Sequence, residues 1–183
     1  MMKRFSLLVP ATILFIISNC SYSAIPKMDL VLNDLVYLRD PEKTQEKMGA
    51  INQMMDFQAD YPFIYLISID NEQYAKLFFY PGDTPNTISL IEIGYVDNSI
   101  LSDLHKIQVE DTFRTDSGLY LGMSEEDLKR KKGDPTREDG QYYHYQWDET
   151  FVLSHFNTPD YSEVVRFSKD RKVDYIRFGF DYP

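Results

Sequence analysis

The sequence predicts an α+β protein, in which an antiparallel sheet has one or two helices packed on one face. In many short segments apolar and aromatic residues alternate with polar ones, which is the period of a β-strand. Clusters of Asp, Asn, Pro and Gly separate these segments, as they do in hairpins. Two stretches carry helix-capping signals, and no long crossover helix connects the strands as a parallel sheet would require.

The N-terminal end has the pattern of an export signal. Lys3 and Arg4 precede an apolar run over residues 5–17, and Ser21-Tyr22-Ser23 offers small residues before a cut ahead of Ala24. The apolar run is shorter than the roughly 20 residues that a membrane-spanning helix needs. We therefore expect residues 1–23 to be a signal peptide, and the mature chain to be exported to the periplasm, the outer membrane or the cell surface.

Cys20 leaves a second interpretation of this end open. The segment Ile17-Ser18-Asn19-Cys20 resembles a bacterial lipoprotein signal, in which the cysteine is lipidated and becomes the new N-terminus. Cys20 is the only cysteine, so simple cleavage near Ser23 would leave a mature chain without a disulfide or a thiol nucleophile. In that case an ordinary apolar core must hold the fold.

The charge of the chain restricts the class of partner. Removing Lys3 and Arg4 with the signal would change the formal charge from −10 to −12. A chain this acidic repels nucleic acids and anionic membranes, so we expect neither as a partner. The charge promotes solubility and also suits a basic protein partner.

Residues 24–111 are expected to form a helix followed by antiparallel strands. Asp40 as cap and Pro41 at the first helical position predict a helix that runs to about Phe57. Apolar residues at helical spacing would place one face of this helix in the core: Met48, Ile51, Met54 and Met55. The segment 28–38 fits a helix and a strand equally well. Strands are predicted at residues 63–69, 73–80, 87–96 and 105–110.

Residues 112–183 are expected to form a short helix and then an antiparallel meander. Ser124 is the predicted N-cap, Asp127 stands at the third helical position, and Gly133 with Pro135 ends the helix. Acidic residues in the first turn and basic residues in the last both suit the helix dipole. Four strands are predicted after it, at residues 141–147, 150–156, 162–168 and 173–180.

This second segment resembles a known envelope module. The residues that carry the resemblance are Leu121-Gly122-Met123-Ser124, Asp127-Leu128, Gly133-Asp134-Pro135, Tyr143-His144-Tyr145-Gln146-Trp147, Val164-Val165-Arg166-Phe167 and Val173. Together they resemble the BamE (SmpA/OmlA) type of small outer-membrane lipoprotein and the β-lactamase-inhibitor-protein type of repeat. The resemblance covers residue 113 to the C-terminus, and it implies an exported domain that works by protein contact.

The sequence contains no catalytic or cofactor motif that we recognise. There is no Gly-x-Ser-x-Gly, no phosphate-binding glycine loop and no dinucleotide fingerprint. The histidines His105, His144 and His155 have no metal-binding spacing, and a pair of His144 with His155 across a hairpin would lack a third ligand. We therefore expect no catalytic residue, no metal and no cofactor.

The aromatic run at residues 142–147 is the best candidate for a binding surface. Strand alternation places Tyr143, Tyr145 and Trp147 on one face, opposite Tyr142, His144 and Gln146. Two interpretations of the first set stay open. These rings either pack in the core or form an exposed aromatic face of the kind that dominates protein interfaces.

These observations predict a non-enzymatic exported binding or accessory protein. It would act through contacts with another envelope or secreted protein, as an inhibitor, an immunity protein or an assembly factor. The alternatives are a hydrolytic enzyme with an unrecognised acid–base pair and a small-ligand-binding protein of the periplasm.

Overall fold

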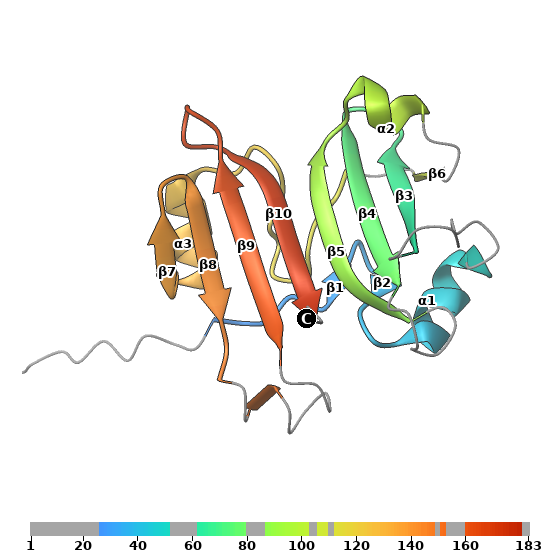
Figure 1. Ribbon diagram of the computed structural model, residues 1–183, viewed down its shortest axis with the longest axis horizontal. Helices are drawn as coiled ribbons and strands as arrows, with labels where there is room; N and C mark the ends of the chain where they lie inside the picture. The colour runs from blue at the N-terminus through green and yellow to red at the C-terminus, as the bar shows by residue number, and fades with distance from the viewer. Residues whose placement is uncertain are drawn as a thin grey trace, which may run out of the picture.

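A computed structural model describes residues 26–51, 62–79, 87–102, 106–109, 112–148, 151–152 and 160–180. Figure 1 shows a broad twisted sheet seen face on. The predicted signal peptide and Cys20 lie outside the described residues.

The described residues form ten strands and three helices. In chain order they are β1 Val31–Leu32, β2 Val36–Tyr37, α1 Pro41–Met48, β3 Phe63–Ser68, β4 Gln73–Phe79, β5 Ile88–Tyr95, α2 Asn98–Ser102, β6 Lys106–Val109, α3 Glu125–Lys132, β7 Arg137–Asp139, β8 Tyr142–Gln146, β9 Tyr161–Phe167 and β10 Val173–Phe180. None of the helices in this part of the chain has the length and apolar character needed to cross a bilayer.

Eight of the strands form one sheet in the order β6-β3-β4-β5-β10-β9-β8-β7, and β1 and β2 form a separate hairpin. Every neighbouring pair in the large sheet is antiparallel except β6, which runs parallel to β3 at the sheet edge. The chain reaches that edge by crossing back from β5 past β4 and β3, with α2 in the connection.

The predicted fold class is therefore wrong. The protein is mostly β with a large mixed sheet and three short helices, not an antiparallel sheet with one or two helices packed on a face. The helices are too short to cover the sheet, since α1 and α3 have eight residues each and α2 has five. Other parts of the chain therefore close the core.

The strands β5 and β10 join the segments 24–111 and 112–183 into one sheet. Their register runs from Tyr175 opposite Gly94 to Gly179 opposite Leu90. Gly179 has φ 140°, and a Cβ there would lie 2.3 Å from the backbone oxygen of Ser89. Only glycine allows the two strands to approach this closely.

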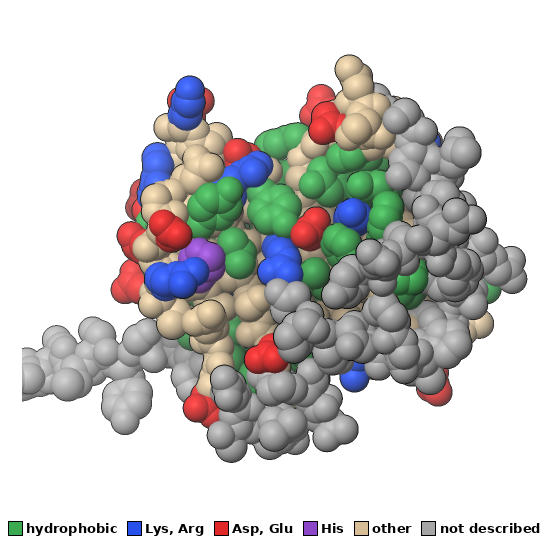
Figure 2. Space-filling model, in the orientation of Figure 1, with side chains coloured by type: hydrophobic (Ala, Val, Ile, Leu, Met, Phe, Trp, Pro, Cys, Tyr) green, Lys and Arg blue, Asp and Glu red, His purple; other side chains and the backbone are tan. Residues whose placement is uncertain are grey.

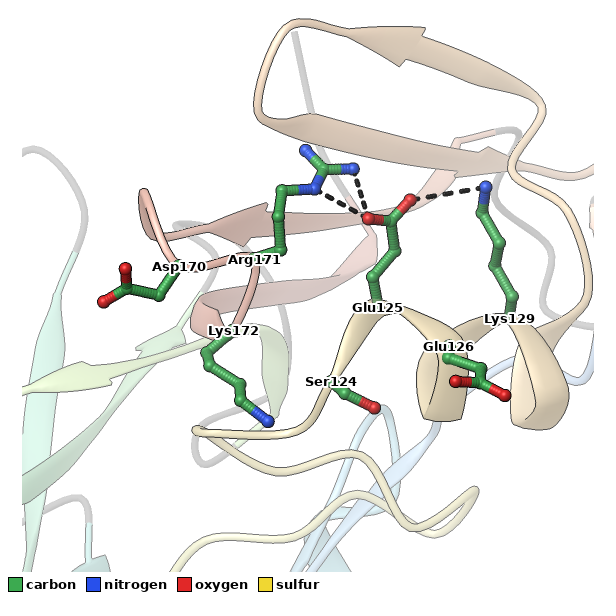
Figure 3. A pocket seen from close by; sticks show the side chains of 7 residues that line it. All are labelled: Ser124, Glu125, Glu126, Lys129, Asp170, Arg171 and Lys172. Carbon is green, nitrogen blue, oxygen red and sulfur yellow. Dashed lines mark hydrogen bonds and ion pairs between the residues drawn. The ribbon is translucent and has the colours of Figure 1, made fainter.

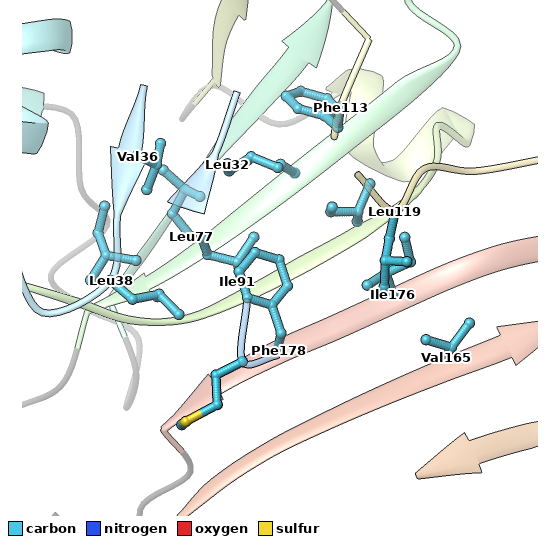
Figure 4. Packing of buried hydrophobic residues seen from close by; sticks show 14 of the residues in the cluster. Leu32, Val36, Leu38, Leu77, Ile91, Phe113, Leu119, Val165, Ile176 and Phe178 are labelled. Carbon is cyan, nitrogen blue, oxygen red and sulfur yellow. The ribbon is translucent and has the colours of Figure 1, made fainter. Parts of the chain in front are cut away.

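The core lies on one face of the sheet, under the β1–β2 hairpin, α3 and the loop that precedes α3. Figure 4 shows Leu32 and Val36 of the hairpin near Leu77, Ile91 and Phe178 of the central strands. All five side chains are fully buried. The segment 28–38, which fits helix and strand equally in the sequence, thus contains a hairpin that covers the junction of the two halves.

The helix α3 has the ends that the sequence predicts. The Ser124 hydroxyl accepts a hydrogen bond from the Asp127 N–H at 3.1 Å, and the Gly133 N–H donates to the Lys129 carbonyl at 2.8 Å. Its buried side chains are Leu128 and Lys132. In Figure 1, α3 lies behind β7 and β8.

The helix α1 starts as predicted but ends at Met48 instead of near Phe57. Gly49 adopts φ 75° there, and its N–H donates to the Gln45 carbonyl at 2.8 Å. Ile51 is buried as predicted. Met54 and Met55 lie outside the described residues.

The predicted bounds of the other strands agree with the observed bounds to within a few residues, with one exception. From the predicted strand at 150–156 only Phe151 and Val152 are described, and they form a helical turn in which the Val152 N–H donates to the Asp148 carbonyl at 3.0 Å. The strand β8 pairs instead with β9 and β7. The strand β7 and the helix α2 are not predicted, because β7 is entirely polar and α2 is a single short turn between two strands.

Candidate interaction surface on the open face of the sheet

The sheet face opposite the core presents partly exposed side chains from seven of its strands. We call this surface the open face, and we define it by residues that alternate with core residues along each strand: Phe63, Tyr65, Tyr74, Lys76, Phe78, Leu90, Glu92, Tyr142, His144, Val164, Arg166, Asp174, Tyr175 and Arg177, with Arg137 at the edge. Figure 2 looks onto this face, and apolar side chains gather across it with basic and acidic groups among them.

The register of the strands arranges these side chains in cross-strand rows. The middle row runs Tyr65, Lys76, Glu92, Arg177, Val164, His144 and Arg137. Side chains directly opposite each other on neighbouring strands make contact. Glu92 therefore stands between two cations, and its Oε1 lies 3.7 Å from Nε of Arg177.

An aromatic cluster surrounds Lys76 in the first half of the face. The Nζ of Lys76 lies 4.0 Å from the ring centroid of Phe63 and 4.7 Å from that of Phe78. The rings of Phe63 and Tyr65 meet edge to face at 5.4 Å, and Tyr65 meets Tyr74 in the same way at 5.7 Å. Cation–π and edge-to-face contacts of this kind favour particular positions of the exposed rings.

The second half of the face is held by an ion pair and a second cation–π contact. Nε of Arg166 donates to Oδ1 of Asp174 at 2.7 Å, and its guanidinium lies 5.3 Å from the ring of Tyr175. Burial and the nearby charge of Arg137 lower the pKa of His144, so this ring is neutral at pH 7. His144 thus adds a flat, uncharged ring to the surface.

A pocket opens at the end of the face that α2 borders. Its volume is about 280 Å³, and its lining includes Tyr74, Tyr95, Tyr175, Asp97 and Asp174. Arg166, Gly94 and Ile100 complete the lining. A Cβ at Gly94 would lie 2.7 Å from the ring of Tyr74, so this ring rests directly on the glycine backbone. We call this cavity the tyrosine pocket.

The tyrosine hydroxyls of this pocket lie in a negative field. Burial and the charge of Glu92 raise the pKa of Tyr74 to about 12. Burial and the charges of Asp174 and Glu72 raise the pKa of Tyr95. Both hydroxyls therefore remain protonated at neutral pH, and that of Tyr95 lies near Gly122 of the loop before α3 instead of inside the pocket.

The structure places the predicted binding residues Tyr143, Tyr145 and Trp147 on the core side. Tyr143 and Tyr145 are 1% and 0% exposed. The Tyr143 hydroxyl donates to Glu125, and the Trp147 Nε1–H donates to the Pro26 carbonyl at 2.8 Å. Of the two interpretations, these positions favour core packing, while Tyr142 and His144 of the same strand face outward.

The sequence analysis does not anticipate a buried charge cluster beneath the sheet. Nζ of Lys132 lies 2.9 Å from Oδ2 of Asp29 and 2.7 Å from Oε2 of Glu163, and all three side chains are 0% exposed. Among the described residues, Oε1 of Glu163 has no hydrogen-bond partner. Lys132 is the last of four consecutive basic residues, so the sequence gives no sign that it differs from its exposed neighbour Lys131.

The three groups of this cluster differ in protonation. Burial raises the pKa of Glu163 to about 8, so its carboxyl is mostly protonated at pH 7. Burial also disfavours the charged form of Asp29, but the charge of Lys132 together with hydrogen bonds with Asp116, Lys132 and the Ser117 backbone outweighs it and holds the pKa of Asp29 below its usual value. Asp29 and Lys132 therefore form the ion pair. The cluster is sealed from solvent, which gives it a structural role.

A second, wider opening of about 510 Å³ lies at the start of α3. Figure 3 shows Glu125 between Arg171 and Lys129 in this opening. Oε2 of Glu125 lies 2.6 Å from Nη2 of Arg171, and its Oε1 lies 3.4 Å from Nζ of Lys129. These ion pairs connect α3 to the β9–β10 turn. We therefore assign the charged residues of this opening a structural role.

The histidines form no metal site in the part of the chain that the structure describes. There, no group of three or more His, Cys, Asp and Glu side chains could hold a metal ion. His144 lies on the open face, and His105 and His155 lie outside the described residues.

No family model, curated protein or solved structure matches this chain. The surfaces and contacts described above are therefore the basis for a functional conclusion.

Proposed function

We propose that this protein is a non-enzymatic exported binding or accessory protein, and that the open face contacts another protein of the cell envelope. The observation that carries the proposal is the set of partly exposed aromatic and aliphatic side chains spread over the central strands, with charged groups among them. Interface cores are enriched in Tyr, Phe and Arg, and a few such residues supply most of the binding energy.

The rigidity of the open face supports a binding role. Lys76, Arg166 and Glu92 make cation–π contacts or ion pairs within the face. Side chains already held in place lose less conformational entropy when a partner binds. The face is thus preorganised for contact with a protein surface.

The perturbed titratable groups support a non-enzymatic role. Glu163 has a strongly raised pKa, as a general acid would, but it is completely buried and bonded to Lys132. Glu125 is neutralised by Arg171 and Lys129. These groups are engaged in holding the fold together, so we assign them no catalytic role.

The sequence supports the location and class of the partner. The export pattern at residues 1–23 supports a partner in the envelope or outside the cell, and the acidic charge favours approach by a basic protein. An inhibitor or immunity protein and an envelope-assembly factor are both consistent with this mode of action.

Affinity capture with matched variants tests the proposal. The mature chain, starting at Ala24, serves as bait in an envelope extract. A variant with Tyr65→Ser, Tyr142→Ser and Val164→Ser should retain at most about a tenth of the captured partner, because three contacts of the open face are removed. A control with Ile69→Ser and Phe151→Ser loses apolar side chains that are 62% and 42% exposed outside the face, and it should capture normally.

The comparison is valid only if both variants have the same unfolding midpoint as the parent protein. Equal capture by the two variants would contradict the open face as the contact surface. Hydrolytic activity of the parent in a broad substrate screen, without any specific partner, would contradict the non-enzymatic role.

A further inference from the structure

We propose that the tyrosine pocket accepts a cationic side chain of the protein partner, and that it prefers arginine. This inference rests on the proposed function, because it assigns one anchor point within the open face.

The walls of the pocket are aromatic and preorganised. Tyr74 is fixed between the backbone of Gly94 and the ring of Tyr65, which it meets edge to face at 5.7 Å. Tyr175 carries the guanidinium of Arg166 against its ring. Tyr95 lines the pocket beside Gly94, but its side chain leaves β5 on the opposite face, where its hydroxyl lies near Gly122 of the loop before α3. The rings of Tyr74 and Tyr175 at one cavity form a favourable environment for a cation.

The charges at the pocket favour a cation over an anion. Asp97 and Asp174 line it, and the one basic residue among the described lining residues, Arg166, is already paired with Asp174 at 2.7 Å. Hydrogen bonds from the Ser99 hydroxyl and from the backbone N–H groups of Ile100 and Ser99 lower the pKa of Asp97, so it is ionised at neutral pH.

Neighbouring charges do not reverse this balance. In the adjacent row Glu92 lies between Lys76 and Arg177, so its negative charge offsets part of their positive charge. The carboxylate of Asp97 therefore gives the pocket mouth its negative charge.

The size of the pocket suits a single side chain. Pockets for drug-sized ligands occupy roughly 300–1,000 Å³, and this one measures about 280 Å³. A guanidinium is planar, stacks on rings and reaches carboxylates with a fork of donors, whereas an ammonium is a compact, strongly hydrated charge. The ring of Tyr175 already lies near one guanidinium, that of Arg166, in this structure.

Titration of the ¹⁵N-labelled mature protein with small probes tests the inference. We expect N-acetyl-arginine methylamide to shift the backbone amide signals of Gly94, Tyr95 and Tyr175 in a saturable manner, with a dissociation constant on the order of millimolar. N-acetyl-citrulline methylamide, its neutral analogue, should give no saturable shift at the same ionic strength. N-acetyl-lysine methylamide should bind more weakly than the arginine probe.

Matched variants assign the effect to the pocket. Tyr175→Leu removes a ring from the pocket wall and Asp97→Asn removes a charge but keeps a capping side chain, and each should weaken binding of the arginine probe about fivefold or more. Tyr175→Phe keeps the ring and should bind normally. Asp40→Asn makes the same change at the N-cap of α1, outside the pocket, and should also bind normally.

Equal shifts with the arginine and citrulline probes, or equal binding by Tyr175→Leu and the parent, would overturn the inference. Neither result would contradict the proposed function, because partner capture by the open-face variants is a separate measurement that does not use these probes.

Discussion

Lys132 connects three parts of the chain that are distant in sequence. Its Nζ donates to the carbonyl of Lys27, to Asp29 at 2.9 Å and to Glu163 at 2.7 Å. The segment that follows the predicted signal peptide is thereby attached to α3 and β9. The hydroxyl of Tyr161 adds a hydrogen bond to the Asp29 carbonyl at 2.6 Å.

Removing this cation should destabilise the fold strongly. Lys132→Met leaves the ionised Asp29 buried without a counter-charge and removes the hydrogen-bond donor to Glu163, and breaking a buried pair in this way costs about 3–5 kcal/mol. Urea unfolding at pH 7 measures the loss. The matched change Lys131→Met affects an exposed neighbour and should cost less than about 0.5 kcal/mol. Equal losses at the two positions would contradict the buried cluster.

The raised pKa of Glu163 predicts a specific pH dependence of stability. Its carboxyl ionises near pH 4.5 in the unfolded chain and near pH 8 in the folded protein, so the unfolded chain binds fewer protons between these values. The contribution of Glu163 to stability is therefore fully present below about pH 4.5 and is lost as the pH rises to about 8. Each pKa unit corresponds to about 1.4 kcal/mol.

Chemical unfolding between pH 4.5 and 8.5 checks this dependence. The parent protein should lose several kcal/mol of unfolding free energy relative to Glu163→Gln across this range, because the variant cannot ionise there. Parallel pH profiles for the two proteins would show that Glu163 titrates normally.

Some residue-scale features can be predicted from sequence and others cannot. The alternation at residues 142–147 separates Tyr143 and Tyr145 from Tyr142 and His144 correctly, because side chains alternate across any strand. Which set faces the core depends on what covers each face of the sheet, and no local pattern contains that information. Lys132 is unpredictable for the same reason, since Asp29 and Glu163 come from distant segments.

At the scale of elements, the junction of β5 with β10 unites the two halves of the sheet. Five residue pairs are in register across it, and Gly179 allows the close approach. The β1–β2 hairpin and the loop before α3 cover this junction on the core side (Figure 4). The two halves are therefore expected to unfold together.

Gly179→Ala tests the junction. The new Cβ would meet the Ser89 oxygen at 2.3 Å and would also require a backbone φ of 140°, so we expect a loss of roughly 3 kcal/mol or more, or failure to fold. Gly140→Ala is the matched control, because Gly140 has φ 59° but no atom within 4 Å of a Cβ. It should cost about 1 kcal/mol. Similar losses in thermal unfolding would argue against close packing at the junction.

Local signals predict the elements that depend on local chemistry. The ends of α3 follow from Ser124 and Gly133, and most strands follow from their period. The end of α1 has a local signal too, Gly49, which the longer apolar pattern to Phe57 obscures. The parallel pairing of β6 and the small share of helix in the core depend on how distant segments pack, so the α+β prediction fails at that level.

At the scale of the whole molecule, the sheet separates two tasks. One face packs the core and the buried ion pair. The other face presents aromatic and charged side chains that contact one another through cation–π contacts and ion pairs. The net charge of −10 gives long-range attraction for a basic partner, and the tyrosine pocket gives a point of attachment. Binding through the open face is the central claim of this account.

Tyrosine-directed footprinting by mass spectrometry tests that claim most directly, with the protein labelled alone and in complex with its captured partner. We expect Tyr65, Tyr142 and Tyr175 on the open face to be protected in the complex, and Tyr37 and Tyr120, which lie outside it, to react as in the free protein. Protection of Tyr37 or Tyr120 with unchanged labelling of the open-face tyrosines would contradict the account.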